Sequence, residues 1–245
     1  MFRHQGKSRT LNHNLRIATV LSFVAGIVNV TGFLAIQQLT TNVTGHFALF
    51  INDVAELELW RGTVYFLYIF SFLFGSFVSG LLIELVSKNK KLNIFVLPTL
   101  LECTVLILVA ILTGFSVLES PDIIACLLLF AMGVQNSFVT KISNAVVRTT
   151  HLTGLFTDLG IELSQLLFPK KHPYQKKIVS TIKLRLYIIC FFFFGGLVGG
   201  FLYTKIGFNV LLIAALILMT GLIFDNLRFR VILMRRKYRY KKLSN

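Results

Sequence analysis

Apolar residues come in long uninterrupted runs along this chain, without the alternation typical of an amphipathic helix or strand. A run of about 20 apolar residues with few charges is long enough to cross the hydrocarbon layer of a bilayer as a helix. The chain is also only 14% charged, whereas soluble domains carry about a quarter charged residues. We therefore predict an all-α integral membrane protein. The six predicted transmembrane helices cover residues 17–37, 62–86, 93–118, 123–142, 184–203 and 208–224.

Positively charged residues predict the orientation of these spans. If the N-terminus is cytoplasmic and the spans alternate, every Lys and Arg except Arg61 and Lys205 falls on the cytoplasmic side, which is the bias that sets topology in cytoplasmic membranes. We expect a multi-pass protein of the bacterial cytoplasmic (inner) membrane, with basic cytoplasmic tails at residues 1–16 and 225–245. The first apolar run is too long for a signal peptide, so we expect it to be retained. The net charge of +15 then reflects topology and attraction to anionic lipid.

Two polar stretches of the chain share one pattern. Each has a Gly-x-x-Asn element, then a Thr-Thr-x2-Thr-Gly-x-Phe block, then an acidic residue, and each is followed by a Gly-x4-Gly pair in an apolar run. Because the matches occur in the same order, we interpret them as an internal duplication with repeats at residues 17–118 and 123–224. The matched pairs are Gly26 and Gly133, Asn29 and Asn136, Thr40 and Thr149, Thr41 and Thr150, Thr44 and Thr153, Gly45 and Gly154, Asp53 and Glu162, and Gly75 and Gly195.

The number of spans in each repeat predicts how the repeats are related. Three spans are an odd number, so the second repeat enters the membrane from the opposite side. The result is an inverted 3+3 repeat, an arrangement known in secondary transporters, where substrate binds near the midplane between the repeats. Inverted repeats also occur in channels and in proteins with no known transport activity. The pattern therefore favours transport without establishing it.

The segments behind the two Thr-Gly pairs, residues 45–58 and 154–168, are too short to cross a membrane. A threonine hydroxyl can cap the start of a helix, so both segments are predicted helices. If they are re-entrant, their N-termini direct partial positive charge at a shared pocket, which suits an anion or a carboxylate. If they are interfacial, they only cover opposite faces of the bundle. The first segment puts Phe47, Phe50, Ile51, Val54 and Leu57 on one side, and the second separates Leu155, Leu159, Leu163 and Leu166 from Asp158, Glu162 and Gln165.

Polar residues near the duplicated blocks and inside the spans are the candidates for a substrate pathway. Buried amides in membrane helices often bond a neighbouring helix, but the duplication of Asn29 favours a pathway role. Glu102 lies within the third span, where an acid is costly; it is a candidate for proton coupling, or a protonated acid bonded to a neighbour. His46 and His151 either titrate near neutral pH or lie on the surface. The candidate residues are Asn29, Thr41, Thr44, Gly45, His46, Glu102, Gln135, Asn136, Thr150, Thr153 and Gly154.

Enzyme signatures are missing from the sequence, which has no nucleotide-binding glycine loop, no nucleophile elbow and no paired metal-ligand motif. Cys103, Cys126 and Cys190 all fall inside predicted spans, so we interpret them as buried small residues. We expect no enzymatic activity and no cofactor or metal. The expected partners are membrane lipid, a small polar or anionic solute and a second copy in a homodimer, with no nucleic acid.

The duplicated blocks resemble those of the YoaK-like family of bacterial integral membrane proteins of unknown function. Ala131-Met-Gly-Val-Gln-Asn136 and Thr149-Thr150-His-Leu-Thr153-Gly154 carry the resemblance, which extends over about residues 17–224. It implies an inner-membrane protein with about six spans, sometimes described as a transporter, without an established substrate. The family commonly has an acid at the place of Asn29, and Thr-Gly-Asn where this chain has Thr44-Gly45-His46. Glu102 is then the only deep acid that could carry protons here.

These observations favour a small secondary transporter or channel for a small polar or anionic solute. The alternative is a membrane protein that does not transport. In that case the basic tail and the long polar segment at residues 143–183 would bind a partner or anionic lipid.

Overall fold

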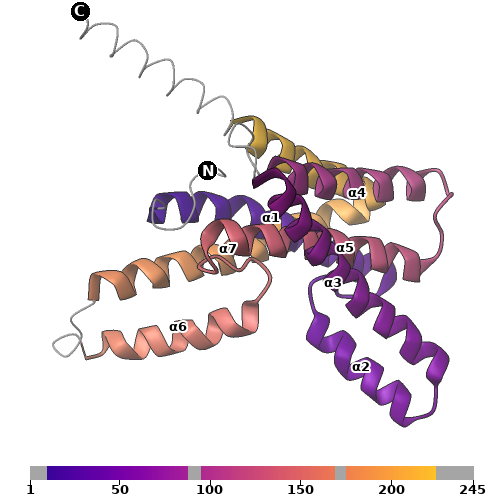
Figure 1. Cartoon of the computed structure of the whole chain (residues 1–245), viewed down its shortest axis with the longest axis horizontal. Coiled ribbons are helices and arrows are strands. Elements are labelled where there is room, and N and C mark those ends of the chain that lie inside the picture. The colour runs from indigo at the N-terminus through magenta and orange to yellow at the C-terminus, as the bar shows by residue number, and fades with distance from the viewer. Residues whose placement is uncertain (1–9, 88–94, 169–174, 225–245) are drawn as a thin grey trace, which may run out of the picture.

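The computed structural model describes residues 10–87, 95–168 and 175–224, which form helices joined by short turns (Figure 1). No strand occurs in these ranges, so the prediction of an all-α protein is confirmed. The basic tails, apart from residues 10–16, and the Lys88–Lys91 loop lie outside the described residues. The helices are α1 (Leu11–Ile36), α2 (Val43–Ala55), α3 (Leu59–Ser87), α4 (Val96–Gly114), α5 (Pro121–Ser143), α6 (Leu152–Leu166), α7 (Gln175–Ile206), the short 3₁₀-helix η3 (Gly207–Asn209) and a final helix at residues 210–224.

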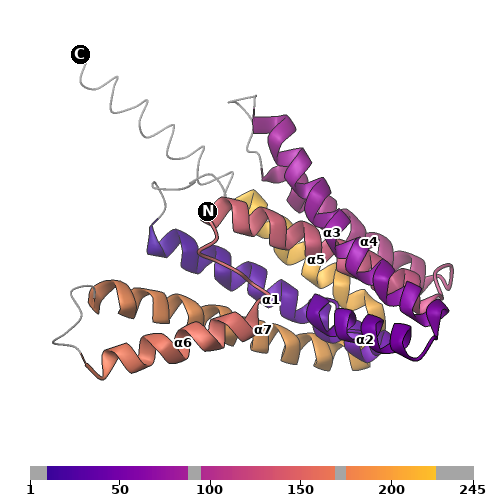
Figure 2. The same cartoon turned by 60° about the horizontal axis from the view of Figure 1, so that its bottom comes forward.

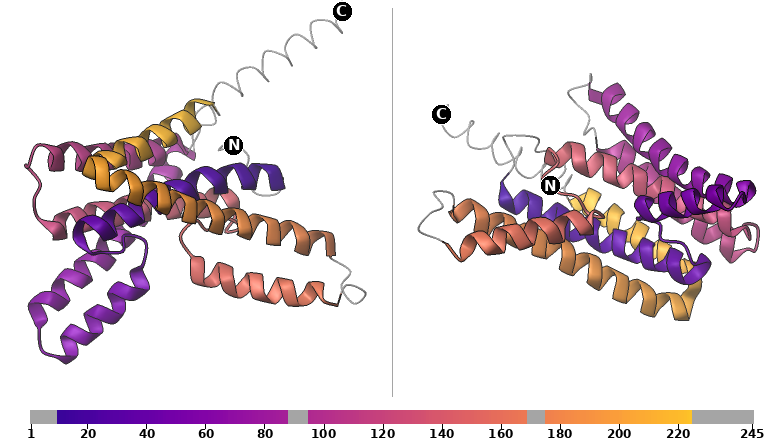
Figure 3. Two further views of the ribbon diagram at one scale, coloured as in Figure 1. Left: turned by 180° about the vertical axis from the view of Figure 1, so that it is seen from behind. Right: turned by 90° about the horizontal axis from the view of Figure 1, so that it is seen from below.

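Five helical segments in the described ranges are long and apolar enough to cross a membrane. Four of them are α1, α3, α4 and α5, and the fifth is the 50-residue stretch Gln175–Phe224. A straight helix of that length would be about 75 Å long, more than twice the ~30 Å hydrocarbon layer. The chain turns at Gly207, whose φ of 56° suits glycine, and Figure 3 shows residues 210–224 leaving α7 in a different direction. The predicted division of this stretch into two spans stays a prediction.

The two most buried long helices, α1 and α5, lie at the centre of the bundle and run in opposite directions (Figure 2). Among the labelled helices, the most extensive contact joins α1 to α7, and the next joins α3 to α5. Both contacts therefore pair a helix of the first sequence repeat with a helix of the second. The shorter helices pack within their own repeat, α2 on α3 and α6 on α7.

Duplicated glycines lie at the closest approaches of these helix pairs. A Cβ atom on Gly26 of α1 would collide with the backbone carbonyl of Phe192 in α7, and one on Gly133 of α5 would collide with that of Phe72 in α3. The contacts recur in the other direction, since Gly195 meets the backbone of Phe23, and Gly75 meets that of Phe130. Small residues are common where membrane helices approach closely. The same backbone contact thus occurs twice, at positions that the sequence duplication matches.

Two helical hairpins project from this central bundle. The α2–α3 hairpin and the α6–α7 hairpin extend toward different ends of the molecule (Figure 1). Apolar side chains remain exposed along the long helices, as Phe70, Phe77 and Phe201 illustrate, and lipid is the natural environment for such a surface. The helices themselves extend beyond the predicted spans, because α1 begins at Leu11 and α7 begins at Gln175. Hydropathy identifies the apolar part of a helix but not its polar continuation outside the hydrocarbon.

Candidate functional site

An asparagine–threonine hydrogen bond lies at the start of each short helix. In the first repeat, the Oδ1 atom of Asn29 accepts from the backbone N–H of Thr41 at 3.2 Å and from its hydroxyl at 2.8 Å. In the second repeat, the Oδ1 atom of Asn136 accepts from the hydroxyl of Thr150 at 2.8 Å. Each bond holds the segment that precedes the short helix beside the asparagine of the long helix before it. Both asparagines therefore bond within their own repeat.

The glycine of each Thr-Gly pair makes room for the residue that caps its helix. The side chain of Asn42 caps α2 by accepting from the N–H of Gly45 at 3.1 Å, and a Cβ on Gly45 would collide with that amide. In α6, a Cβ on Gly154 would collide with the ring of His151, the N-cap residue. The capping residue is thus Asn42 rather than the predicted Thr44. Thr44 and Thr153 occupy the second position of their helices and are exposed.

Gln135 forms a buried polar contact between α5 and α1, and thus between the two repeats. Its Nε2 atom donates to the backbone carbonyl of Leu21 in α1 at 3.0 Å and to the hydroxyl of Thr149 at 3.1 Å. The Gln135 side chain is fully buried, and its Oε1 atom has no hydrogen-bond partner among the described residues. Val28 occupies the matching position of the first repeat, so this polar contact has no equivalent there.

His46 lies in a buried aromatic cluster between α2 and α3. Only 2% of its surface is exposed, and its Nε2 donates to the backbone carbonyl of Leu39 at 2.9 Å, since a carbonyl can only accept. Its ring centroid lies 5.2 Å from that of Tyr68 and 6.2 Å from that of Tyr65. The hydroxyl of Tyr68 donates to Asp122 at the start of α5. Burial lowers the pKa of His46, and the hydrogen bond to Leu39 partly opposes this shift.

An ion pair occupies the corresponding place between α6 and α7. Arg185 of α7 donates to both carboxylate oxygens of Glu162, at 2.8 and 2.9 Å, and lies 2.9 Å from Asp158. The side chains of Arg185 and Glu162 are 20% and 13% exposed, so this bidentate pair is largely shielded from water. Beside it, Leu159 packs against Ile178 and Ile182 of α7. The second hairpin is thus held by an ion pair and an apolar contact.

Glu102 lies in α4, away from both short helices in the sequence. Its side chain is fully buried, and neither carboxylate oxygen has a hydrogen-bond partner among the described residues. The neighbouring Cys103 contacts the backbone carbonyl of Ala215 in the final helix, with a sulfur–oxygen distance of 3.7 Å. An acid buried without a partner is costly unless it is protonated.

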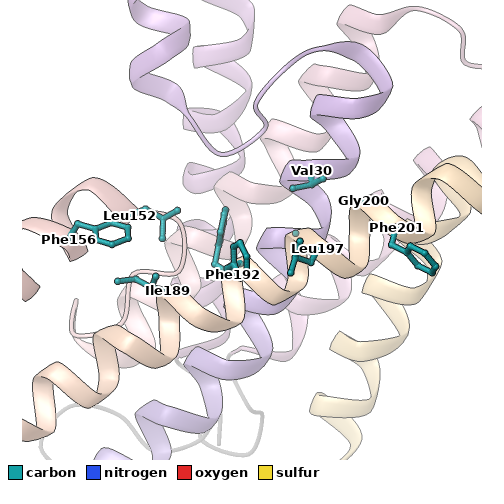
Figure 4. Close-up of a pocket in the computed structure, with 10 residues that line it drawn as sticks. Val30, Leu152, Phe156, Ile189, Phe192, Leu197, Gly200 and Phe201 are labelled. Atoms are coloured by element: carbon teal, nitrogen blue, oxygen red, sulfur yellow. The ribbon is translucent and has the colours of Figure 1, made fainter.

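A cavity of about 580 Å³ lies between α1, α6 and α7. Figure 4 shows its lining: Val30 comes from α1, Leu152 and Phe156 come from the start of α6, and Phe192 and Phe201 come from α7. Val30 follows Asn29, so the cavity reaches from the polar block of the first repeat to the short helix of the second. Its walls are apolar, however, and none of the candidate pathway residues lines it.

The structure brings some of the candidate residues together and separates others. It joins Asn29 to Thr41, Asn136 to Thr150, and Gln135 to Thr149. His46 belongs to a different cluster, and His151 is exposed. Sequence reasoning missed Tyr65, Tyr68, Asp122 and Arg185, although the three-residue spacing of the two tyrosines places them on one helix face.

Comparisons with known proteins give a consistent result. The family described as "Protein of unknown function (DUF1275)" matches residues 17–224. The UPF0700 transmembrane protein YoaK of Bacillus subtilis (strain 168) is 27% identical over 186 residues, which cover 74% of this chain and 80% of that protein. No solved structure matches this chain. Since the family match covers the described bundle from α1 to the final helix, this membrane protein belongs to the DUF1275 family, as the resemblance of its Thr-Gly blocks predicted.

Proposed function

We propose that this protein is a small secondary transporter or channel for a small polar or anionic solute. It would cross the bacterial cytoplasmic membrane six times, with both termini in the cytoplasm. The observation that carries this proposal is the reciprocal packing of the two repeats, with one short helix beginning beside each central asparagine.

The glycine contacts support a two-fold relation between the repeats. Gly26 meets α7 in the same way that Gly133 meets α3, and the central helices α1 and α5 run in opposite directions (Figure 2). Asn29 and Asn136 each lie about one helical turn beyond these glycines. If the glycine contacts lie near the midplane, the short helices begin close to it from opposite sides. Helix N-termini at this depth are a recurring feature of transporter binding sites.

The final helix supports a sixth crossing. Val210, Leu211, Ala214 and Leu218 belong to the same buried core as α1 and α4. The turn at Gly207–Asn209 allows α7 and residues 210–224 each to cross a ~30 Å hydrocarbon layer separately. An even number of crossings would put both termini on the same side, and the distribution of Lys and Arg favours the cytoplasm as that side.

The alternative is a membrane protein that binds anionic lipid or a partner and does not transport. Two observations favour it: the asparagines bond within their own repeats, and the cavity beside α6 is apolar. Of the segments that would bind a partner, the tail at residues 225–245 lies outside the described residues, whereas residues 143–183 are described except for 169–174. Transport assays decide between the two functions.

The experiment measures solute flux through the purified protein in lipid vesicles. Vesicles loaded with buffer are mixed with acetate, phosphate or glycerol, and light scattering records the rate at which they recover their volume. We expect faster recovery than in protein-free vesicles for at least one of these solutes. The variants Thr44→Val and Thr153→Val hold the side-chain volume and remove exposed hydroxyls at the two helix N-termini. Both should remain folded and lose the flux.

A matched control is Thr204→Val, which removes an exposed hydroxyl of α7 far from either short helix in the sequence. Its flux should equal that of the unmodified protein. If none of the three solutes crosses faster with protein than without it, and none raises the temperature of unfolding, the transport proposal is wrong. The lipid- or partner-binding function then takes its place.

A further inference from the structure

The His46 cluster combines a buried titratable ring with a missing hydrogen-bond partner. One ring nitrogen donates to Leu39, which precedes α2, whereas the Nδ1 atom is buried without a partner among the described residues. A polar side chain buried in this way costs free energy unless something binds it. The neutral ring needs only one donor contact, so the vacant acceptor at Nδ1 is the place where an additional proton can bind.

Titratable groups on α3, on α5 and on α2 itself lie around His46. Tyr65 and Tyr68 of α3 contact its ring, and Asp122 of α5 is linked to it through the Tyr68 hydroxyl. On its own helix, Asp53 lies two turns further along and is 8% exposed. Its Oδ2 atom also has no partner among the described residues. Neither carboxylate hydrogen-bonds to the His46 ring in the packed arrangement.

We propose that His46 is a proton-binding site, and that its protonation releases the start of α2 from the 37–42 turn and from α3. The neutral ring fits the packed arrangement, because its single N–H is bonded and its faces contact aromatic rings. A proton added at Nδ1 places a charge and an unpaired donor among those rings. The proton comes from water and forms an N–H bond at Nδ1, and no other covalent bond forms or breaks.

The direction of the pH dependence follows from the burial of the ring. A buried histidine binds its proton less readily than a released one, whose pKa is about 6.5. The packed arrangement is therefore fully favoured above that pH. Below it, the ratio of packed to released α2 falls by up to about tenfold per pH unit, until the packed form also protonates.

The second repeat has no histidine at the matching position. Leu155 occupies the position of His46, and Arg185 occupies the position of Tyr65 in the corresponding helix pair. Proton binding would therefore loosen one hairpin and leave the other packed. If the transport function proposed above holds, this asymmetry identifies the proton as the coupling ion and α2 as the moving gate.

The experiment follows hydrogen–deuterium exchange by mass spectrometry in the full-length protein in lipid nanodiscs. Exchange is compared at about pH 7.5 and about pH 5.5, on either side of the ordinary histidine pKa of about 6.5, after correction for the intrinsic rate. We expect amides of residues 43–50 to lose at least ~fivefold protection at the lower pH, as the linkage predicts. Residues 152–159, the matching start of α6, act as the internal control and should keep their protection.

Two variants assign the effect to His46. His46→Gln keeps a donor for Leu39 but does not titrate, so its α2 protection should be the same at both pH values. His46→Leu, which installs the residue found in α6, gives the same answer if the glutamine variant does not fold. His151→Gln, at the exposed cap of α6, should behave like the unmodified protein.

The proposal is overturned if residues 43–50 are equally protected at both pH values, or if their pH response persists in both His46 variants. A parallel loss of protection in residues 152–159 also contradicts it, because acid would then loosen the whole bundle. These measurements require no flux, so the absence of transport would leave the proton-binding result unaffected. Conversely, flux that does not depend on pH would refute the coupling and leave the transport function intact.

Discussion

The α2–α3 and α6–α7 hairpins occupy matching positions in the two repeats but are held by different chemistry. Buried His46 and Asp53 form the inner face of α2, and its apolar residues Phe47 and Ile51 are more than half exposed. The inner face of α6 consists of Leu155 and Leu159, and its carboxylates bind Arg185. Helix α2 thus buries these two polar side chains, whereas the carboxylates of α6 bind one arginine of α7.

At the positions matched by the predicted duplication, backbone contacts therefore agree more closely than side-chain interactions do. The close glycine contacts and the asparagine–threonine bonds occur in both repeats, because they determine how near the helices approach and where each short helix begins. The faces of the short helices are less restricted, since either an aromatic cluster or an ion pair can hold a hairpin together. The first solution places a buried histidine, whose pKa burial lowers, between aromatic rings, and the second places a bidentate ion pair at the same point.

The largest expected effect tests what the repeats share. Gly26→Ala and Gly133→Ala each place a methyl group against a backbone carbonyl of the paired helix. Overpacking of this kind costs about 1–3 kcal/mol, and more where backbone must move. The temperature of unfolding in detergent should fall in both variants, and the two decreases should be similar to each other.

Gly160 provides the control, because nothing lies within 4 Å of a Cβ placed there. Gly160→Ala in the middle of α6 should raise stability by up to about 1 kcal/mol through helix propensity. Markedly unequal losses in the first two variants would break the equivalence of the two glycine contacts.

The next effect tests the ion pair of the second hairpin. Arg185→Gln removes the bidentate contact and leaves Glu162 largely buried without its cation. We expect the free energy of unfolding to fall by about 1.5–3 kcal/mol, the range for hydrogen bonds to charged groups. Arg61→Gln is the matched variant in the first hairpin, where the Arg61 and Glu58 side chains are 72% and 46% exposed. Its loss should be at most about 1 kcal/mol, and equal losses would contradict the contrast between the hairpins.

The smallest effect removes one difference between the repeats. Gln135→Val installs the residue type of Val28 and deletes both donated hydrogen bonds. It also deletes the unpartnered Oε1 atom, and the carbonyl of Leu21 lies within a helix. We therefore expect chemical denaturation to give a change within about 1 kcal/mol. A much larger loss would mean that Gln135 has a positioning role that the contact to Leu21 does not account for.

Sequence reasoning predicted the membrane class, the central helices and the short helices behind the Thr-Gly pairs, because all of these are local properties. It did not predict that α2 buries His46 and exposes Phe47. In water the apolar face of a helix turns inward, but in a membrane both faces can meet an apolar environment. The rotation of α2 is therefore decided by the tyrosines of α3 and by the Leu39 carbonyl.

The amino-acid sequence alone predicts an internal duplication and shows which residues match in it, since the spacing of residues can be read directly from their order. The tertiary structure decided that Asn29 and Asn136 bond within their own repeats, and that α1 pairs with α7 and α5 with α3. These pairings depend on backbone approach at Gly26, Gly75, Gly133 and Gly195. A glycine in the sequence indicates that another helix can approach closely, but only the tertiary structure shows which helix does so.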